Sequence, residues 1–224
     1  MDNLTPLVAV VDDDPALRDL VKHVLGTVGH DALSHGTVED FLDDDHVDRA
    51  GCVICDVRMP GLGGLGLLNR LAEDPYAPPV ILLTAHGDAQ MAVRALRAGA
   101  FEFLEKPFRD QDLLDVVQRA VSLDAKRRKQ RAALNDLQQR HETLTPRERQ
   151  VFRLVVEGSS NRKIAELMEL SQKTVEVHRA HVMSKMFAGS LAGLVRMAVA
   201  LEVAAGEDPL ESLPSLTAGG DSGR

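Results

Sequence analysis

Five short apolar runs, separated by stretches of helical character, constrain the fold of this 224-residue chain most strongly. The apolar runs are residues 7–11, 31–34, 52–55, 80–84 and 101–104. Helical segments are expected at residues 15–28, 37–42, 64–72, 88–98 and 110–121. Strands that alternate with helices over short connections form a largely parallel sheet with helices on both faces. The pattern therefore predicts a doubly wound α/β domain built on a five-stranded parallel sheet.

Residues that can bind a metal ion or a phosphoryl group follow or close four of these runs. They are Asp12 and Asp13, Asp56, Thr84, and Lys106. In doubly wound sheets ligands bind outside the carboxyl ends of the strands, so we expect these side chains in one crevice. Carboxylates that lie this close are unfavourable unless a cation shares them, and oxygen ligands suit Mg²⁺. A carboxylate that accepts a phosphoryl group, with a metal ion, a hydroxyl and an ammonium beside it, explains the set.

The two cysteines have the C-x-x-C spacing of some redox motifs. Cys52 and Cys55 both lie within the third apolar run. Residues three apart in an extended strand point to opposite faces of the sheet, so the two thiols should not meet. We therefore expect two buried, unpaired thiols.

Charge divides the chain into an acidic front and a basic rear. The formal net charge is −11 over residues 1–123, +6 over residues 124–205 and −3 over residues 206–224. This asymmetry suggests that the front holds cations and that the rear meets a polyanion. The N-terminus carries no basic region or long apolar stretch, and no run is long enough to span a membrane. We therefore expect a cytoplasmic protein without a signal peptide.

The rear of the chain predicts a small all-α domain of four helices. A capping box with proline at the first helical position, Thr145 to Glu148, starts a helix that ends near Gly158. Further helices are expected at residues 161–168, 172–186 and 190–204. Before them, residues 124–139 favour either a solvated helix that continues the preceding one or a short coiled-coil contact. Residues beyond 204 are rich in Gly, Ser, Pro and acids, and we expect disorder there.

The third rear helix has two distinct faces at 100° per residue. Val175, Val182 and Met186 should face the domain core. The opposite face consists of Glu176, Val177, Ala180 and Ser184, and it is small and mixed, so it could approach base edges in a DNA major groove. Basic residues suited to phosphate contacts flank this face: Lys173, Arg179 and Lys185, with Arg162 and Lys163 on the preceding helix.

The front motifs resemble the receiver domain of two-component response regulators over about residues 6–122. The matching segments are 10–14 (VVDDD), 56–61 (DVRMPG), 84–88 (TAHGD) and 103–108 (FLEKPF). The resemblance implies a flavodoxin-like fold in which Asp56 accepts phosphate from a sensor histidine kinase. It implies that Asp12, Asp13, Asp56 and the backbone carbonyl of Arg58 hold Mg²⁺, and that Thr84 and Lys106 contact the phosphoryl group. It further implies a switch aromatic at Phe103 and a cis bond between Lys106 and Pro107.

The rear motifs resemble the LuxR-type output domain, which makes the whole chain similar to the FixJ/NarL class and to FixJ-like regulators most closely. The matching segments are 144–151 (LTPRERQV), 161–165 (NRKIA) and 173–179 (KTVEVHR). The implied DNA contacts are Lys173, Thr174, Glu176, Val177, Arg179, Ala180 and Lys185. The implied organisation is a receiver at 6–122, a helical linker at 123–141, a LuxR-type domain at 142–204 with its helix-turn-helix at about 161–180, and a tail at 205–224.

The resulting hypothesis is a transcription factor whose phosphorylation at Asp56 drives receiver dimerisation and promoter binding, with RNA polymerase as a further partner. Its chemistry would be confined to its own phosphorylation and dephosphorylation. A Mg²⁺-dependent phosphatase or phosphotransferase with an aspartyl-phosphate shares the acidic pocket and is the alternative. A phosphorylated module whose rear helices bind another protein is a second alternative. The apolar stripe of the fourth rear helix, at Leu191, Leu194, Val195 and Ala198, fits either a dimer contact or the domain core.

Overall fold

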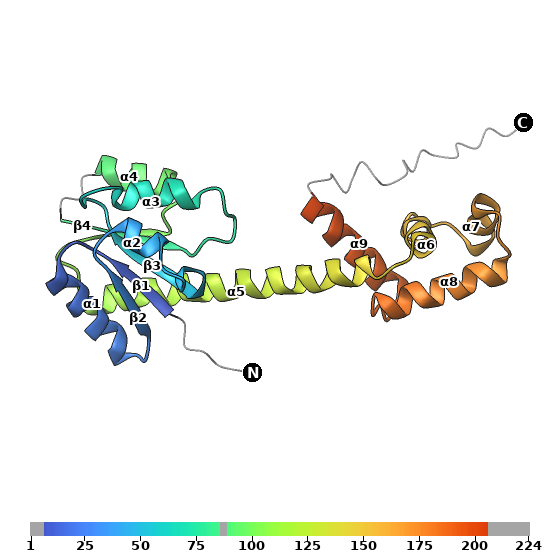
Figure 1. Ribbon diagram of the computed structural model, residues 1–224, viewed down its shortest axis with the longest axis horizontal. Helices are drawn as coiled ribbons and strands as arrows, with labels where there is room; N and C mark the ends of the chain where they lie inside the picture. The colour runs from blue at the N-terminus through green and yellow to red at the C-terminus, as the bar shows by residue number, and fades with distance from the viewer. Residues whose placement is uncertain (1–6, 86–88, 206–224) are drawn as a thin grey trace, which may run out of the picture. The chain divides into compact units, whose positions relative to one another are not determined.

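The computed structural model describes residues 7–85 and 89–205 (Figure 1). The N-terminal segment 1–6, the motif residues 86–88 with the expected helix start at Asp88, and the expected disordered tail from residue 206 lie outside the described residues. Within the described ranges the chain forms two compact units, one up to Lys129 and one from Gln130. Each unit has its own apolar core.

The first unit contains the predicted five-stranded parallel sheet. Its strands are β1 (Leu7–Val11), β2 (Asp31–His35), β3 (Ala50–Asp56), β4 (Val80–Thr84) and β5 (Glu102–Glu105). Their order in the sheet is β2-β1-β3-β4-β5 and all neighbouring pairs are parallel. This is the flavodoxin-like order, so the predicted fold class is confirmed. Strand β3 is central, and all of its residues are buried.

Helices cover both faces of this sheet. They are α1 (Pro15–Thr27), α2 (Val38–Leu42), α3 (Gly63–Leu71), α4 (Ala89–Arg97) and the first part of α5 (Asp110–Glu142), with a short 3₁₀ turn at Val47–Arg49. Apolar residues of α1 and α5 pack on one face, and those of α2, α3 and α4 pack on the other (Figure 1). Cys52 joins the first core and Cys55 the second, so the two thiols face opposite sides as expected. Both cysteines are free, and burial raises the pKa of both thiols.

Local sequence explains where these helices begin. The Asp14 side chain accepts a hydrogen bond from the backbone N–H of Ala16, and Pro15 occupies the first helical turn of α1. The Thr37 hydroxyl accepts a hydrogen bond from the N–H of Asp40 at the start of α2. Side-chain caps of this kind satisfy backbone donors that have no partner within the helix.

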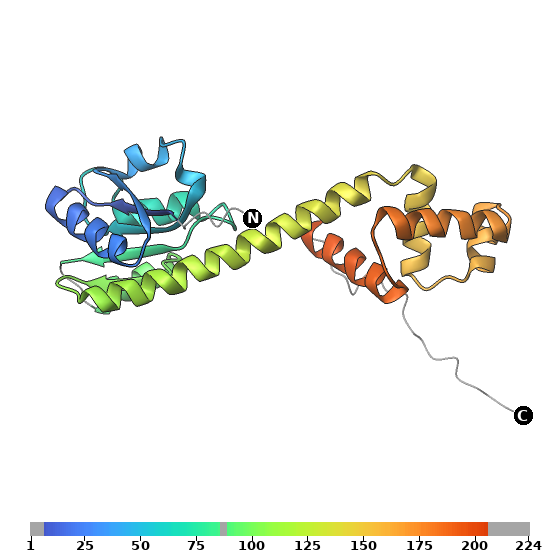
Figure 2. The same cartoon turned by 90° about the horizontal axis from the view of Figure 1, so that it is seen from below.

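Helix α5 continues without a break from the receiver helix through the expected linker, as the continuous-helix alternative proposed (Figure 2). The middle of α5 is attached to the first unit by Arg128, whose guanidinium donates hydrogen bonds to the carbonyls of Asp48 (2.6 Å) and Ala50 (2.8 Å). The same guanidinium pairs with the buried carboxylate of Asp124. These contacts explain why the first compact unit extends to Lys129, beyond the receiver end expected at residue 122.

The second unit contains the four expected helices. They are α6 (Pro146–Val156), α7 (Asn161–Met168), α8 (Gln172–Lys185) and α9 (Leu191–Ala205). The predicted capping box is present, because Thr145 and Glu148 exchange both hydrogen bonds. On α9, Leu194 and Ala198 are buried in the core, whereas Leu191 is exposed. The apolar stripe of α9 therefore divides between core and surface.

Candidate functional site

The register of the sheet brings the predicted phosphoacceptor residues to one edge. Val11 pairs with Cys55, so Asp12 and Asp56 follow on neighbouring strands. On the other side, Asp56 pairs with Leu83, which places Thr84 one residue beyond. Thr84 pairs with Glu105, and Lys106 is the next residue. Asp12, Asp56 and Thr84 are all buried, with exposed fractions of 2%, 7% and 2%.

The Lys106 ammonium bridges two of these carboxylates. Its Nζ donates to Asp12 Oδ2 at 2.8 Å and to Asp56 Oδ1 at 2.6 Å. Burial alone would lower the pKa of Lys106, but the two carboxylates outweigh it and hold the pKa above its ordinary value. The Lys106 backbone N–H also donates to the Thr84 carbonyl at 2.7 Å, which ties the start of this loop to β4. The bond between Lys106 and Pro107 is cis, as the resemblance implied.

Of the other predicted members of this pocket, Asp13 and Arg58 lie close in the chain to Asp12 and Asp56, and Phe103 lies on β5. Asp13 is exposed and forms no hydrogen bond or ion pair with a described residue. The Arg58 backbone N–H donates to Asp56 Oδ2 at 2.8 Å, so the turn after β3 folds back on the carboxylate. Phe103 on β5 is half-buried and packs against the core beneath α2, α3 and α4. The Asp56 carboxylate is therefore bound by the turn at Arg58 and by Lys106, which also binds Asp12.

The donor set fits a hard divalent cation. Asp12 and Asp56 present carboxylate oxygens at the edge of a buried sheet, and Asp13 adds a third carboxylate next to them in the chain. Among the described residues no three acidic, histidine or cysteine side chains are already grouped as ligands. In this pocket the Lys106 ammonium lies between the carboxylates of Asp12 and Asp56. A cation would therefore share the carboxylates with this ammonium.

Two residues that support the pocket escaped the sequence reasoning. A Cβ placed on Gly64 would lie 2.7 Å from the Asp56 carbonyl oxygen and 2.6 Å from Leu82 Cδ2, so only glycine lets α3 approach β3 this closely. The Arg18 guanidinium on α1 donates to the Asp12 carbonyl and braces the end of β1. The run of glycines at residues 61–66 was the only sequence signal for the first contact.

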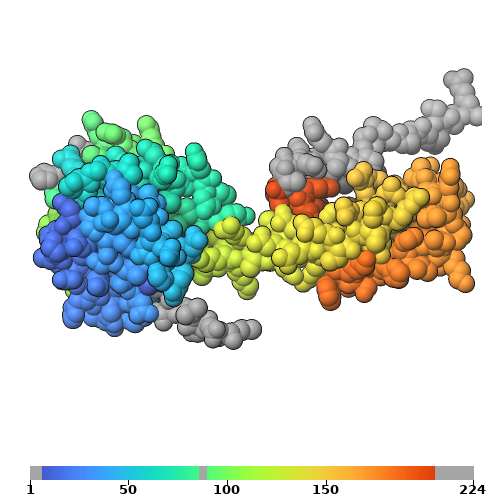
Figure 3. Space-filling model, in the orientation of Figure 1, coloured from blue at the N-terminus to red at the C-terminus, as the bar shows by residue number. Residues whose placement is uncertain are grey.

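In the second unit, the faces of α8 follow the prediction. Val175, Val182 and Met186 are at most 1% exposed and face the core. The residues of the outward face, Glu176, Val177, Ala180 and Ser184, are exposed, as is Lys173. The surface formed by α7 and α8 is orange in Figure 3. Thr174 is half-buried and its hydroxyl bonds to Ser171, the cap of α8, at 2.7 Å. Arg179 is half-buried, and Arg162 and Lys163 on α7 are exposed.

Lys185 differs from the other basic residues of α8. Its ammonium donates to Glu148 Oε2 at 2.6 Å and to the Thr143 carbonyl at 3.1 Å. Glu148 is 3% exposed and also faces His181 Nδ1 at 3.4 Å. The hydrogen bond from Lys185, together with the N–H of Thr145, lowers the pKa of Glu148 to about 2. The lysine thereby joins the end of α8 to the start of α6.

Comparison with known proteins agrees with this architecture. Residues 8–118 match the response regulator receiver domain family, and residues 142–198 match the bacterial regulatory proteins of the luxR family. The chain is 41% identical over 199 residues to Nodulation protein W of Bradyrhizobium diazoefficiens, covering 89% of this chain and 88% of that protein. It is also 41% identical over 190 residues to the transcriptional regulatory protein FixJ of the same organism, covering 85% and 93%.

This chain belongs to the FixJ-like response regulators. Among solved structures, the response regulator StyR superposes with a TM-score of 0.79 at 39% identity, covering 87% of this chain and 98% of that one. The FixJ-like regulator is thus a DNA-binding transcriptional regulator of a two-component system, with a receiver followed by a LuxR-type output domain. None of its described helices has the length and apolar character of a membrane span.

Proposed function

We propose that a sensor histidine kinase donates a phosphoryl group to Asp56 of this regulator. One carboxylate oxygen of Asp56 forms the new O–P bond as the N–P bond of the kinase phosphohistidine breaks. The bridge from Lys106 to Asp12 and Asp56 is the observation that carries this proposal, because it places a cation against the acceptor carboxylate. In the phosphorylated state the ammonium turns to the phosphoryl oxygens, and Thr84 supplies a hydroxyl donor.

We propose Asp12, Asp13 and Asp56, with the backbone carbonyl of Arg58, as the residues that hold Mg²⁺. Bound there, the ion neutralises charge that builds on the phosphoryl oxygens. The side chains prepare this chemistry by keeping two carboxylates buried beside one ammonium. We also propose that the receiver acts on no substrate beyond its own phosphorylation and dephosphorylation. Sustained turnover of p-nitrophenyl phosphate would instead support the phosphatase alternative.

Phosphorylation would be transmitted through Phe103 and α4 to a second copy of the chain. Phe103 is half-buried beside the core, and Val93 and Leu96 on α4 are 47% and 51% exposed. Added negative charge at Asp56 draws Thr84 and Lys106 inward and repacks this face, which then forms a homodimer. Dimerisation would place two α8 helices on promoter DNA about 34 Å apart, one turn of the double helix. We propose RNA polymerase as the partner of the DNA-bound dimer.

For DNA contact, we propose that Lys173, Thr174 and Arg179 meet phosphates and that Glu176, Val177 and Ala180 face base edges. The exposure of Lys173, Glu176, Val177 and Ala180 on one side of α8 supports this assignment. We give Lys185 a different role from the phosphate contact predicted from sequence. Because Glu148 and the Thr143 carbonyl hold its ammonium, we propose that it positions α8 against α6.

The acceptor assignment is tested by phosphorylation of Asp56→Asn with acetyl phosphate and Mg²⁺, resolved on a phosphate-affinity gel. Asp45→Asn is the matched control, because Asp45 is an exposed acid in the same unit. We expect the control to gain the phosphorylated band and Asp56→Asn to lack it. A phosphorylated band in Asp56→Asn would show that another residue is the acceptor.

A further inference from the structure

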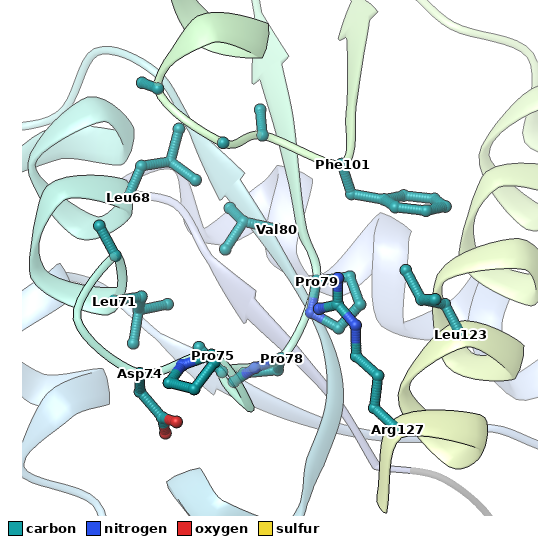
Figure 4. Close-up of a pocket in the computed structure, with 15 residues that line it drawn as sticks. Leu68, Leu71, Asp74, Pro75, Pro78, Pro79, Val80, Phe101, Leu123 and Arg127 are labelled. Carbon is teal, nitrogen blue, oxygen red and sulfur yellow. The ribbon is translucent and has the colours of Figure 1, made fainter. Parts of the chain in front are cut away.

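A cavity of about 510 Å³ lies in the first unit at the edge of the sheet opposite to Asp56 (Figure 4). It lies at the amino ends of two strands, since its lining includes Val80, the first residue of β4, and Phe101, which precedes β5. Its volume falls within the roughly 300–1,000 Å³ range of small-molecule sites. The chemistry proposed above uses none of the residues that line it.

Most of the side chains that line this cavity are apolar, and they offer few hydrogen-bond donors. Leu68 and Leu71 come from α3, Leu123 comes from α5, and Pro75, Pro78 and Pro79 form the loop between α3 and β4. Proline has no N–H, so this loop presents carbon and carbonyl surface. On the opposite wall, the N–H groups of Gly99, Ala100 and Phe101 already donate to backbone carbonyls. A ligand that required several backbone donors would not be satisfied here.

Arg127 is the exception among the lining residues. Figure 4 shows its side chain extending from α5 toward Pro79 at the edge of the cavity. The side chain is half-buried, and no described residue forms a hydrogen bond or ion pair with its guanidinium. Its charge acts on Asp124, but Arg128 provides the hydrogen bond to that carboxylate. A partly desolvated guanidinium of this kind favours a planar anion that can accept two hydrogen bonds.

We propose that this cavity binds a small organic carboxylate with an aromatic or branched apolar body. The carboxylate would accept hydrogen bonds from Arg127, and the body would lie against the leucine and proline walls. A single negative charge fits best, because Asp74 also lines the cavity and would repel a second one. The site would require neither Asp56 nor DNA, so it is a separate input to the regulator.

The position of this site on α5 gives it a physical consequence. Leu123 and Arg127 are within five residues of Arg128, which fastens the same part of the helix to the carbonyls of Asp48 and Ala50. A ligand in the cavity would contact both the proline loop and α5, on a side of α5 different from the one that Arg128 attaches. Occupancy would therefore hold the start of the segment that leads to the output domain more firmly against the receiver.

The test is calorimetric titration of the full-length protein with 1-naphthoate and with 1-naphthamide, its neutral analogue. We expect the carboxylate to bind at one site and the amide to bind about tenfold to a hundredfold more weakly, as the loss of a charge-assisted pair implies. Arg127→Gln should remove that difference. Lys126→Gln, an exposed neighbour on the same helix, should keep it.

Three results would overturn the proposal: no saturable binding of naphthoate, equal affinity for acid and amide, or unchanged discrimination in Arg127→Gln. If Arg127→Gln does not fold, Ala98→Leu provides the second test, because Ala98 is a half-buried lining residue without charge. A larger side chain there should weaken both ligands alike. Undiminished binding of both ligands to Ala98→Leu would place them elsewhere and also overturn the proposal.

Discussion

Replacing Lys185 by Gln should destabilise the second unit while leaving its phosphate contacts with DNA in place. Glu148 is 3% exposed and receives its shortest hydrogen bond, 2.6 Å, from the Lys185 ammonium. Without that ammonium the carboxylate keeps the Thr145 N–H at 2.8 Å and the more distant His181 at 3.4 Å. The variant therefore leaves a buried negative charge with less than its full set of partners.

The magnitude follows from the exposure of the two partners. Breaking a fully buried pair costs about 3–5 kcal/mol, and losing a hydrogen bond to a charged group costs about 1.5–3 kcal/mol. Because the Lys185 side chain is 35% exposed, water replaces part of the interaction. We therefore expect the free energy of unfolding of the second unit to fall by about 2 kcal/mol, within the range for a lost hydrogen bond to a charged group. In a unit of this size that corresponds to a fall in melting temperature of roughly 8–16 °C.

Two measurements distinguish the positioning of α8 by Lys185 from a contact between Lys185 and a DNA phosphate. Hydrogen exchange of α6 and α8 in the full-length protein reports the stability of the second unit alone, and the salt dependence of DNA binding counts phosphate contacts. Lys185→Gln should speed exchange and leave the salt slope unchanged. Lys173→Gln, the exposed control, should keep exchange within about 0.5 kcal/mol of wild type and lower the slope by about 1.

The opposite result would refute the reasoning. If Lys185→Gln exchanged like wild type and its salt slope fell by about 1, Lys185 would be a phosphate contact. Its bond to Glu148 would then contribute little to the position of α8. Faster exchange together with a lower salt slope would assign both roles to Lys185 and would refute its restriction to positioning α8.

Three further predictions follow from single contacts. Because the pKa of Glu148 is depressed to about 2, its contribution should be complete above about pH 4.5 and lost as the pH falls toward 2, measured by hydrogen exchange over that range. Arg128→Gln should lower the free energy of unfolding of the first unit by about 2 kcal/mol in urea, because it leaves the buried Asp124 carboxylate unpaired. Combining it with Asp124→Asn should recover part of this stability. Gly64→Ala should cost about 1–3 kcal/mol in the same assay because its Cβ meets the Asp56 carbonyl, whereas Gly26→Ala, which meets nothing within 4 Å, should not destabilise.

The receiver pocket could be predicted from sequence because the position of each member along the chain is enough to place it. Each residue stands at the carboxyl end of an apolar run, and parallel strands in register bring those ends to one edge. The pairing of Val11 with Cys55 and of Thr84 with Glu105 realises this expectation. The ammonium bridge from Lys106 could not be read the same way, because it depends on side-chain reach across the crevice between two specific carboxylates.

Lys185 shows that the periodicity of a helix alone does not predict which residue a side chain will bind. A helical wheel places it beside the outward face of α8, where a basic residue suggests DNA. Its actual partner, Glu148, belongs to α6 and was predicted only as a member of a capping box. That carboxylate caps its own helix and anchors another one. The second role depends on the packing of α6 against α8, which neither helix encodes alone.

The basic run at residues 126–129 makes the same point within four residues of α5. In sequence, Lys126 and Arg127 are indistinguishable from Arg128 as a solvated charge cluster. Successive helical residues turn by about 100°, so only some of them can face the receiver. Arg127 reaches the proline-lined cavity, Arg128 binds the carbonyls at the start of β3, and Lys126 is exposed. Three successive basic residues therefore have three different environments, because each is turned about 100° from the one before it.

Strand β3 connects these observations to the regulation of the molecule. Its last residue, Asp56, is the proposed phosphoacceptor, and its first residue, Ala50, accepts a hydrogen bond from Arg128 on α5. Every residue between them is buried, so the strand cannot shift at one end without disturbing packed neighbours on both faces. Arg128 is therefore the residue at which a change near Asp56 and a ligand on Arg127 would act on the same turn of α5.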